Sequence, residues 1–305
     1  MLDDVVKRAI PFPKDSKILI FGGGFTGQHI AAIARSLGAE VLCSRRNLES
    51  KGADFEYDSN KKFIKSKKIL NGVTHVISCI PPLPNGEDPV LINLGKEFLE
   101  MSLKWVGYLS TTGVYGDCQG NWVSENDTPR PKQLRSIRRL ACEQAWEDTG
   151  LPVQILRLPG IYGPGRSTLD AYKKKSIKAI DKAGQVFSRI HIDDIAGAII
   201  HLINLYAQGK CPKIINLADN LPASNLEVME YAAKLLGTEL PLIEPFEIAS
   251  QEMSPMALSF WLENRKISNK ILCKSMGYSL IHPDYKSGLK DCLIKTTEQK
   301  TKYSN

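Results

Sequence analysis

Short apolar runs alternate with longer amphipathic segments along most of this chain, and the alternation predicts strands and helices in turn. The run at 18–21 is too short for a globular helix and fits a strand buried on both faces. Similar strand signals lie at 41–43, 74–80, 105–109, 153–158 and 214–217, and 53–58 could add a short strand. Apolar residues at helical spacing occupy 30–37, 89–103, 132–148 and 225–236, and residues 189–196 lead into an apolar helix that ends at 203. Buried strands that alternate with helices indicate a parallel sheet covered on both faces.

The order of these elements predicts an α/β fold, with a Rossmann doubly wound parallel sheet and a smaller mixed C-terminal substrate lobe. We expect residues 1–16 to be a lead-in and residues 17–220 to form the NAD(P)-binding domain. Residues 221–305 would form the lobe, with residues 166–186 contributing to it.

Several charged segments are open to more than one interpretation. Residues 61–70 and 173–182 are basic and predict solvated helices, although the second segment could face a substrate phosphate. Either Asp193 or Asp194 can cap the apolar helix that follows them. His191 could contact a ligand or be a structural histidine.

A glycine-rich turn follows the first strand. Gly22, Gly24 and Gly27 stand as G-x-G-x-x-G, the spacing that permits a tight turn, close approach of a pyrophosphate and close packing of the next helix. The N-terminus of that helix offers N–H groups to phosphate, and Phe25 and Thr26 belong to the same turn. This pattern predicts a dinucleotide site, with a turn that binds nothing as the alternative.

The end of the second strand is where a dinucleotide site contacts the adenosine ribose. An NAD site usually carries an acid there, whereas this chain has Ser44, Arg45 and Arg46. Two guanidiniums could hold a 2′-phosphate, so we favour NADP(H), with NAD(H) possible and exposed arginines as the alternative. Asp58 could meet the adenine amine or be an ordinary turn residue.

Ligands of open α/β sheets bind beyond the carboxyl ends of the strands, which makes the residues at those ends candidates. Ile80 and Pro81 end one strand and form a candidate wall for the cofactor. Pro159 and Gly160 begin a defined loop after another. The hydroxyl cluster at 110–112 follows a third strand, where it could bind substrate or cap backbone groups.

The bulk composition of the 305 residues, 43% hydrophobic and 24% charged, is ordinary for a soluble globular protein. The net charge of +7 favours anionic ligands, but the basic residues do not alternate with aromatic ones, so we expect no nucleic acid partner. No run approaches 18 apolar residues, so we expect no membrane span. Seven scattered cysteines without zinc spacing predict reduced thiols, a cytoplasmic location and no metal site.

Five segments occur in an order that is specific in combination. They are GGGFTG at 22–27, LSTTGVYG at 109–116, RLPGIYGPG at 157–165, RIHIDDIA at 189–196 and NLAD at 216–219. Together they resemble the extended or atypical short-chain dehydrogenase/reductases, the NAD-dependent epimerase/dehydratase family that includes nucleotide-sugar epimerases. The resemblance covers nearly the whole chain and implies a Rossmann sheet with a substrate lobe.

The resemblance also implies residue roles. Thr111 corresponds to the catalytic Ser/Thr that binds the substrate oxygen, and Pro159 with Gly160 to the segment near the nicotinamide. The family's acid/base pair, Tyr-x-x-x-Lys, falls on Arg135 and Arg139, and that helix contains no tyrosine. Arg139 could supply the lysine's fixed charge and Arg135 could hold an anionic substrate. Arginine cannot exchange a proton near neutral pH, so neither replaces the tyrosine.

Two hypotheses follow for function. The first is an NAD(P)-dependent epimerase, dehydratase or reductase that acts by hydride transfer on an anionic substrate, possibly a nucleotide sugar. Tyr115 or Tyr162 would then carry the proton. The second is a non-catalytic NADP(H)-binding sensor or scaffold protein, since the usual acid/base pair is absent. Family members are often dimers, so a homodimer is possible.

Overall fold

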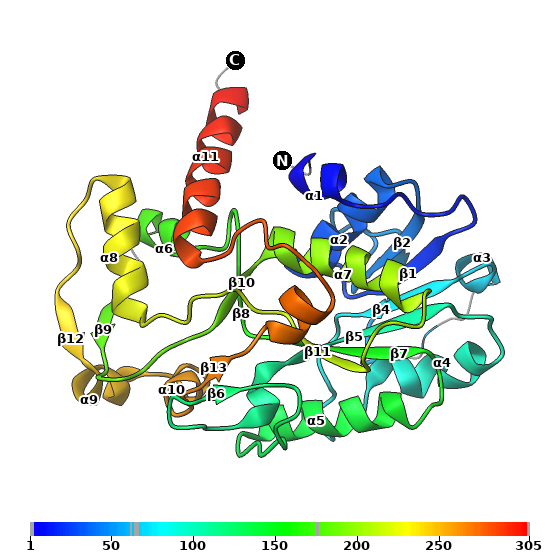
Figure 1. The fold of residues 1–305 in the computed structure, drawn as a ribbon, viewed down its shortest axis with the longest axis horizontal. Coiled ribbons are helices and arrows are strands. Elements are labelled where there is room, and N and C mark those ends of the chain that lie inside the picture. The colour runs from blue at the N-terminus through cyan, green and yellow to red at the C-terminus, as the bar shows by residue number, and fades with distance from the viewer. Residues whose placement is uncertain (1–2, 62, 64–66, 175–176, 304–305) are drawn as a thin grey trace.

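The computed structural model describes residues 3–61, 63, 67–174 and 177–303 (Figure 1). Its central sheet has seven parallel strands in the order β11-β7-β5-β4-β1-β2-β3. Their bounds are β1 Lys17–Phe21, β2 Glu40–Arg45, β3 Phe55–Glu56, β4 His75–Ser78, β5 Trp105–Thr111, β7 Val153–Leu158 and β11 Ile214–Asn216. The predicted α/β fold with a doubly wound parallel sheet is therefore confirmed.

The strand order reverses direction between β1 and β4. From β1 the chain moves outward through β2 to β3, then returns to the other side of β1 and continues outward through β4, β5, β7 and β11. Ligands of open α/β sheets bind at such a reversal, beyond the carboxyl ends of the strands. The turns after β1, β2 and β4 are thus the first place to look for a site.

Helices cover both faces of this sheet (Figure 1). On one face α2 (Phe25–Ser36) and α7 (Ile192–Tyr206) share an apolar core with the strands, and on the other α4 (Pro89–Leu99) and α5 (Leu134–Glu147) do so. The first half of α7 is buried on every side, because it lies among the sheet, α2 and α1 (Asp3–Arg8). The run of apolar residues at 195–200 fits this position. The expected lead-in 1–16 contains α1, which packs here through buried Val5.

A second group of elements lies beside the sheet, on the left of Figure 1. Its helices α6 (Thr168–Lys173), α8 (Asn225–Leu236) and α11 (Tyr285–Tyr303) share an apolar core. In the same group, β9 (Ala179–Asp181) pairs with β12 (Ile243–Pro245), followed by α9 (Phe246–Ala249), η2 (Ser250–Glu252) and α10 (Pro255–Trp261). The parallel pair β8 (Gly160–Tyr162) and β10 (Arg189–His191) connects this group to the sheet.

The C-terminal part of the chain then crosses back toward the sheet. The strand β13 (Lys266–Ile267) pairs with β6 (Trp122–Val123), and the π-helix η3 (Ile271–Ser275) buries Leu272 in the core beneath α7. The predicted division at residue 220 stays a prediction, and the later segment contributes to both groups of elements.

Two predicted helices differ from the structure. The helix expected at 173–182 is wrong, because α6 ends at its first residue and β9 follows as a strand. Ile180 is buried in β9 and pairs with a strand more than 60 residues later, a contact that a local pattern cannot show. Of the helix expected at 61–70, α3 (Lys67–Leu70) is present, and residues 62 and 64–66 lie outside the described part.

Candidate functional site

A cavity of about 460 Å³ opens where the strand order reverses. It is lined by the turns that follow β1, β2 and β4 and by residues near the end of β3. The lining residues are Gly22, Gly23, Gly24, Ser44, Arg45, Arg46, Ser50, Tyr57, Ser59, Cys79, Ile80 and Pro81. The structure therefore brings together seven of the residues predicted to bind the cofactor.

The glycine turn has the shape that a dinucleotide needs. Gly22 has φ +94°, a conformation that L side chains rarely adopt, and a Cβ on Gly27 would lie 2.3 Å from the carbonyl oxygen of Gly22. A Cβ on Gly24 would meet no protein atom within 4 Å, so the space above it is open. No side chain caps the start of α2 and no acid lies in its first turn. The backbone N–H groups at the start of α2 therefore fit a pyrophosphate.

The end of β2 also fits an anionic group. The Nε atom of Arg45 is buried and makes no hydrogen bond within the described part of the chain, whereas Arg46 is exposed. A phosphate would satisfy that donor. The Ser44 hydroxyl accepts a 2.9 Å hydrogen bond from the Gly22 N–H, so it also fixes the glycine turn.

Other cofactor predictions fall outside this cavity. Asp58 does not line it, since its carboxylate accepts from the Asn60 N–H at 3.0 Å, as a turn residue does. Phe25, Thr26 and Gly27 lie in the first turn of α2, beside the cavity rather than among its lining residues.

Sequence reasoning missed Tyr57, Ser59 and Cys79 as lining residues. Each lies near the carboxyl end of a strand, and that position was the available signal. Burial raises the pKa of the Cys79 thiol far above its usual range.

A second cavity, of about 530 Å³, lies between the sheet and the second group of elements. The predicted residues Thr111, Arg135, Arg139, Pro159 and Gly160 all line it. The carboxyl ends of β5 and β7 supply three of these residues, and α5 supplies the two arginines one turn apart. Their assembly follows from parallel strands ending at a common edge.

Thr111 has two roles in this geometry. Its hydroxyl caps the 3₁₀-helix η1 (Thr112–Tyr115) by accepting from the Gly113 N–H at 3.1 Å, so the capping interpretation of the hydroxyl cluster holds here. The side chain also lines the cavity. Ser110 in contrast donates to the buried Glu143 carboxylate and faces the core.

Arg139 is fixed between the two cavities. Its Nη1 donates to the carbonyl oxygens of Ile80 and Leu109 and to the Tyr108 hydroxyl, each at 3.1 Å. Ile80 lines the first cavity and Arg139 the second. The guanidinium therefore places a permanent positive charge where the two cavities approach each other.

Arg135 lies one helical turn away and makes a different contact. Its guanidinium stacks on the Phe260 ring of α10, 3.8 Å from the ring centroid. Partial burial lowers the pKa of this guanidinium, which still stays cationic at neutral pH. The stack joins α5 to α10 across the second cavity.

The tyrosines expected to carry a proton lie elsewhere. The Tyr115 hydroxyl donates to Asn216 Oδ1 at 2.8 Å, and the Arg157 guanidinium lies over its ring at 4.8 Å. The Tyr162 hydroxyl donates to the Asp284 carbonyl oxygen at 3.3 Å. Both side chains are buried outside the lining of either cavity, and burial raises both hydroxyl pKa values. The prediction that one of them reaches the substrate is wrong for this geometry.

Sequence reasoning missed a set of lining residues that come from the later part of the chain. They are Arg189, Asn225, Phe260, Trp261, Glu263 and Arg265. Arg189 lies in the segment 189–196 that carries the family resemblance, whereas the other five residues lie outside the five segments. With Arg135 and Arg139 the cavity holds four arginines and one carboxylate among its described lining residues, so its field favours anions.

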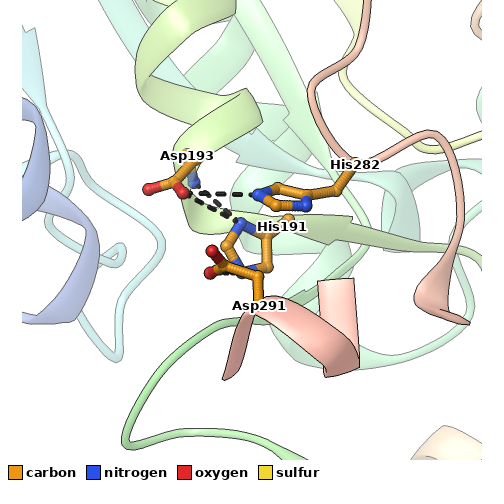
Figure 2. A group of neighbouring side chains, drawn as sticks. All are labelled: His191, Asp193, His282 and Asp291. Carbon is orange, nitrogen blue, oxygen red and sulfur yellow. Dashed lines mark hydrogen bonds and ion pairs between the residues drawn. The ribbon is translucent and has the colours of Figure 1, made fainter. Parts of the chain in front are cut away.

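A third polar cluster, made of His191, Asp193, His282 and Asp291, lies at the start of α7 (Figure 2). None of these four residues lines either cavity. His191 caps this helix by accepting from the Asp193 N–H at 3.3 Å, so the prediction of an aspartate cap is wrong. Burial lowers the pKa of His191 far below 6.5, which keeps the ring neutral. Asp194 instead accepts from the N–H groups of Ile281 and His282 and holds the C-terminal segment.

Comparison with known proteins identifies the family. Residues 91–218 match the NAD dependent epimerase/dehydratase family. A functionally unknown conserved protein from Silicibacter pomeroyi DSS has a similar structure, with 34% identity and a TM-score of 0.82 over 92% of this chain and 98% of that chain. The chain belongs to the NAD-dependent epimerase/dehydratase family.

Two further similarities cover less of the chain or are more distant. Protein YeeZ of Escherichia coli strain K12 is 37% identical over 136 residues, which are 44% of this chain and 47% of YeeZ, about half of that relative. Human epimerase family protein SDR39U1, solved with NADPH, shares the fold at 17% identity and a TM-score of 0.68, over 90% of this chain and 98% of that chain.

Within the described residues, no helix is both long and apolar enough to span a membrane.

Proposed function

We propose that this chain binds NADP(H) in the cavity at the strand-order reversal and acts by hydride transfer on an anionic small molecule in the arginine-lined cavity. A nucleotide sugar is the candidate substrate that the family resemblance favours, and NAD(H) is the alternative cofactor. Solved structures with this fold hold either cofactor, NADPH in human SDR39U1 and NAD in the UDP-glucuronic acid 4-epimerase of Bacillus cereus, so the preference rests on Arg45 and Arg46.

One observation supports this proposal above the others. Arg139 lines the second cavity, while its Nη1 donates at 3.1 Å to the carbonyl oxygen of Ile80, which lines the first. A nucleotide that extends from the glycine turn past Ile80 would therefore end beside the group that meets the substrate.

The chain's own residues would bind and orient both ligands. The uncapped start of α2 would hold the pyrophosphate and Arg45 the 2′-phosphate, while Arg135 would attract the substrate's negative charge. The Thr111 hydroxyl, which already accepts from a backbone N–H, keeps its proton for donation to a substrate oxygen. The nicotinamide, when bound, would supply or accept the hydride.

A second candidate function is cofactor binding without turnover. It is favoured by the chemistry of the second cavity, where no tyrosine, histidine or lysine is found among the lining residues that the structure describes. The carboxylate among them, Glu263, is ion-paired with Arg265 at 2.7 Å. General acid–base catalysis is typically worth about 10²–10⁴ in rate, so its loss would leave a protein that binds better than it turns over.

Calorimetric titration of the nucleotide-free protein with NADPH and NADH tests the cofactor half of the proposal. We expect tight binding of NADPH and weaker binding of NADH. Tight binding of NADH with weak binding of NADPH would refute the selection of the 2′-phosphate by Arg45 and Arg46, but it would still support a dinucleotide site. Binding of neither would remove the whole proposal.

Hydride exchange distinguishes the two candidate functions. Protein loaded with NADPH deuterated at C4 would be incubated with sugar nucleotides, and deuterium would be sought in substrate and cofactor by mass spectrometry. Transfer to or from any sugar nucleotide supports the enzyme. Tight binding without transfer across the panel favours the sensor or scaffold.

A further inference from the structure

The cluster at the start of α7 contains two histidines and two aspartates whose polar atoms converge (Figure 2). One donor atom from each of His191, Asp193, His282 and Asp291 lies within 4.8 Å of the other three. Their side chains are 0%, 4%, 9% and 20% exposed, so the group is largely shielded from water. The four residues come from β10, α7, the loop before α11, and α11 itself.

The spacing within this cluster is too long for good hydrogen bonds. Asp193 Oδ2 lies 3.4 Å from His282 Nε2 and 3.7 Å from His191 Nδ1, and Asp291 Oδ2 lies 3.5 Å from His191 Nε2. Strong N–H···O bonds are about 2.7–3.2 Å long. In a tetrahedron with bonds of 2.0–2.1 Å, neighbouring ligand atoms are about 3.3 Å apart. A single ion can bind only one of the two ring nitrogens of His191. The Asp193–His282 distance and one of the two His191 distances therefore resemble those between ligands of one ion, and the four donor atoms lie within 4.8 Å of one another.

Groups around the cluster orient two of these side chains. His29, on the helix that follows the glycine turn, contacts Asp193 Oδ1 at 2.7 Å and leaves Oδ2 to the cluster. The Asp194 carboxylate accepts from the His282 N–H at 2.9 Å and so fixes the base of that side chain. Supporting contacts of this kind typically accompany metal ligands.

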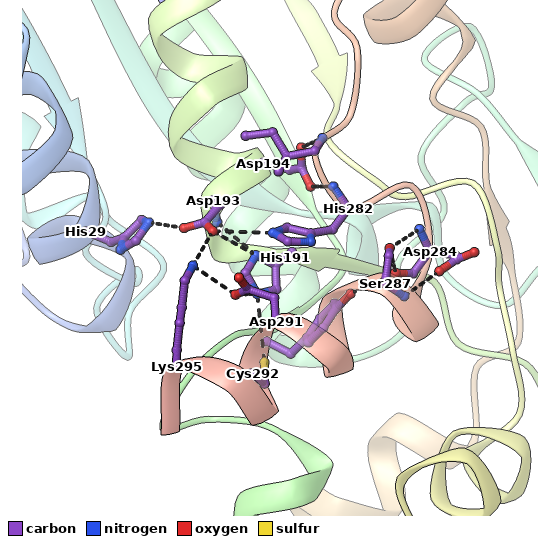
Figure 3. A network of polar contacts seen from close by, with 12 residues as sticks. His29, His191, Asp193, Asp194, His282, Asp284, Ser287, Asp291, Cys292 and Lys295 are labelled. Atoms are coloured by element: carbon purple, nitrogen blue, oxygen red, sulfur yellow. Dashed lines mark hydrogen bonds and ion pairs between the residues drawn. The ribbon is translucent and has the colours of Figure 1, made fainter. Parts of the chain in front are cut away.

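A cation already lies at this position. The Lys295 ammonium is 2.8 Å from Asp193 Oδ2 and 2.8 Å from Asp291 Oδ2 (Figure 3). A divalent ion between the two carboxylates would balance both of their charges, and the lysine side chain that it would displace is 15% exposed at the edge of the cluster.

We propose that His191, Asp193, His282 and Asp291 form a binding site for a divalent transition metal ion of the Zn²⁺ class, which competes with the Lys295 ammonium. Two imidazoles and two carboxylates are the ligand set of such ions. The site would clamp α11 and the loop before it to α7. It is independent of the proposed enzymatic function, because it lies outside both cavities.

Titration of the metal-free full-length protein with Zn²⁺ and Co²⁺ tests this site. We expect one equivalent of Zn²⁺ by calorimetry, and a visible spectrum of tetrahedral Co²⁺ without the near-ultraviolet band of cysteine thiolate ligands. The absence of that band separates this site from adventitious binding by the cysteines. Thermal unfolding with and without Zn²⁺ should show a higher Tm with the ion.

Variants separate the ligands from the competing cation. Lys295→Met should tighten Zn²⁺ binding about tenfold, because no ion pair has to be broken. Asp291→Asn should weaken it by at least about 100-fold. His201→Asn is the matched control, since that ring contacts the Met276 carbonyl oxygen elsewhere, and it should leave binding unchanged. Circular dichroism of each metal-free variant checks that it folds.

Several results would overturn the proposal. They are the absence of stoichiometric binding by the wild type, a cysteine thiolate band with Co²⁺, and equal Zn²⁺ affinity in the wild type and Lys295→Met. The first or the last result would mean that Lys295 is the permanent counter-ion of the cluster. A thiolate band would mean that a cysteine binds the ion and that the proposed ligand set is wrong, since Cys292 Sγ lies 3.8 Å from His191 Nε2. The wild-type spectrum alone decides the question if a variant fails to fold.

Discussion

The choice between NADPH and NADH rests on the end of β2, and replacement of Arg45 by methionine is the sharpest test of it. The change keeps a long apolar side chain but removes the donor whose Nε is buried without a partner. A charge-assisted hydrogen bond to phosphate contributes about 1.5–3 kcal/mol. Arg45→Met should therefore weaken NADPH about 10- to 150-fold. NADH has no 2′-phosphate, so its affinity should change less than about threefold.

Arg46→Met is the matched comparison. Its side chain is exposed, so its ion pair with a phosphate should contribute about 0.2–1 kcal/mol and weaken NADPH about 1.5- to 5-fold. The loss of NADPH affinity in Arg46→Met should become smaller as the salt concentration is raised. The loss in Arg45→Met should persist, because salt screens a partly buried charge pair less.

Calorimetry with both nucleotides measures these effects, and thermal unfolding of the apo variants checks that the fold is intact. An equal loss of affinity for both nucleotides in Arg45→Met would mean that Arg45 shapes the turn and does not select the 2′-phosphate. No loss of either would mean that the guanidinium faces solvent in the complex, and the NADP(H) preference would be refuted.

Three further predictions concern the two cavities and the core. Gly27→Ala should lower stability by about 1–3 kcal/mol in chemical denaturation, because its Cβ would lie 2.3 Å from the Gly22 oxygen, whereas Gly24→Ala should fold normally yet bind NADPH more weakly. Thr111→Val should lower turnover with little change in cofactor affinity, and Thr111→Ser should restore it; unchanged turnover in the valine variant would remove this hydroxyl from the mechanism. Burial lowers the pKa of His75 to about 4 from 6.5, so the unfolded chain binds the extra proton and stability falls as pH drops from 6.5 to 4. In denaturant titrations, His75→Phe should lose about 3 kcal/mol less unfolding free energy than the wild type over this pH range. Parallel pH profiles of stability for the wild type and the variant would contradict this prediction.

Much of the sheet and its first turn could be predicted from local sequence. Buried parallel strands are short apolar runs, and the glycines at 22, 24 and 27 are required by contacts within a single turn. Strand β9 could not be predicted, because a three-residue strand in a basic segment depends on a partner more than 60 residues away. Its pairing, rather than its own composition, makes it a strand.

In the candidate site, the place of a residue at the end of a strand was predictable, but the direction in which its side chain points was not. Thr111, Pro159 and Gly160 lie together because parallel strands end at one edge, and the positions of these residues after predicted strands were enough to expect that. Arg139 lies on α5, and only the family resemblance placed it near them. The orientation of Tyr115 was not predictable, since Asn216, on another strand, supplies the acceptor that holds its hydroxyl in the core. The roles of these residues in chemistry stay predictions until the variants are measured.

By itself, the sequence determined most strands and helices of the central sheet and its glycine turn, because each depends on residues close together in the chain. Only the tertiary structure decided that four arginines surround one cavity and that His191 and His282 converge at another point. The donors of that cluster span about 100 residues and have no common spacing. Their meeting depends on how α11 packs against α7 and β10, and that packing is set by the sum of many side-chain contacts.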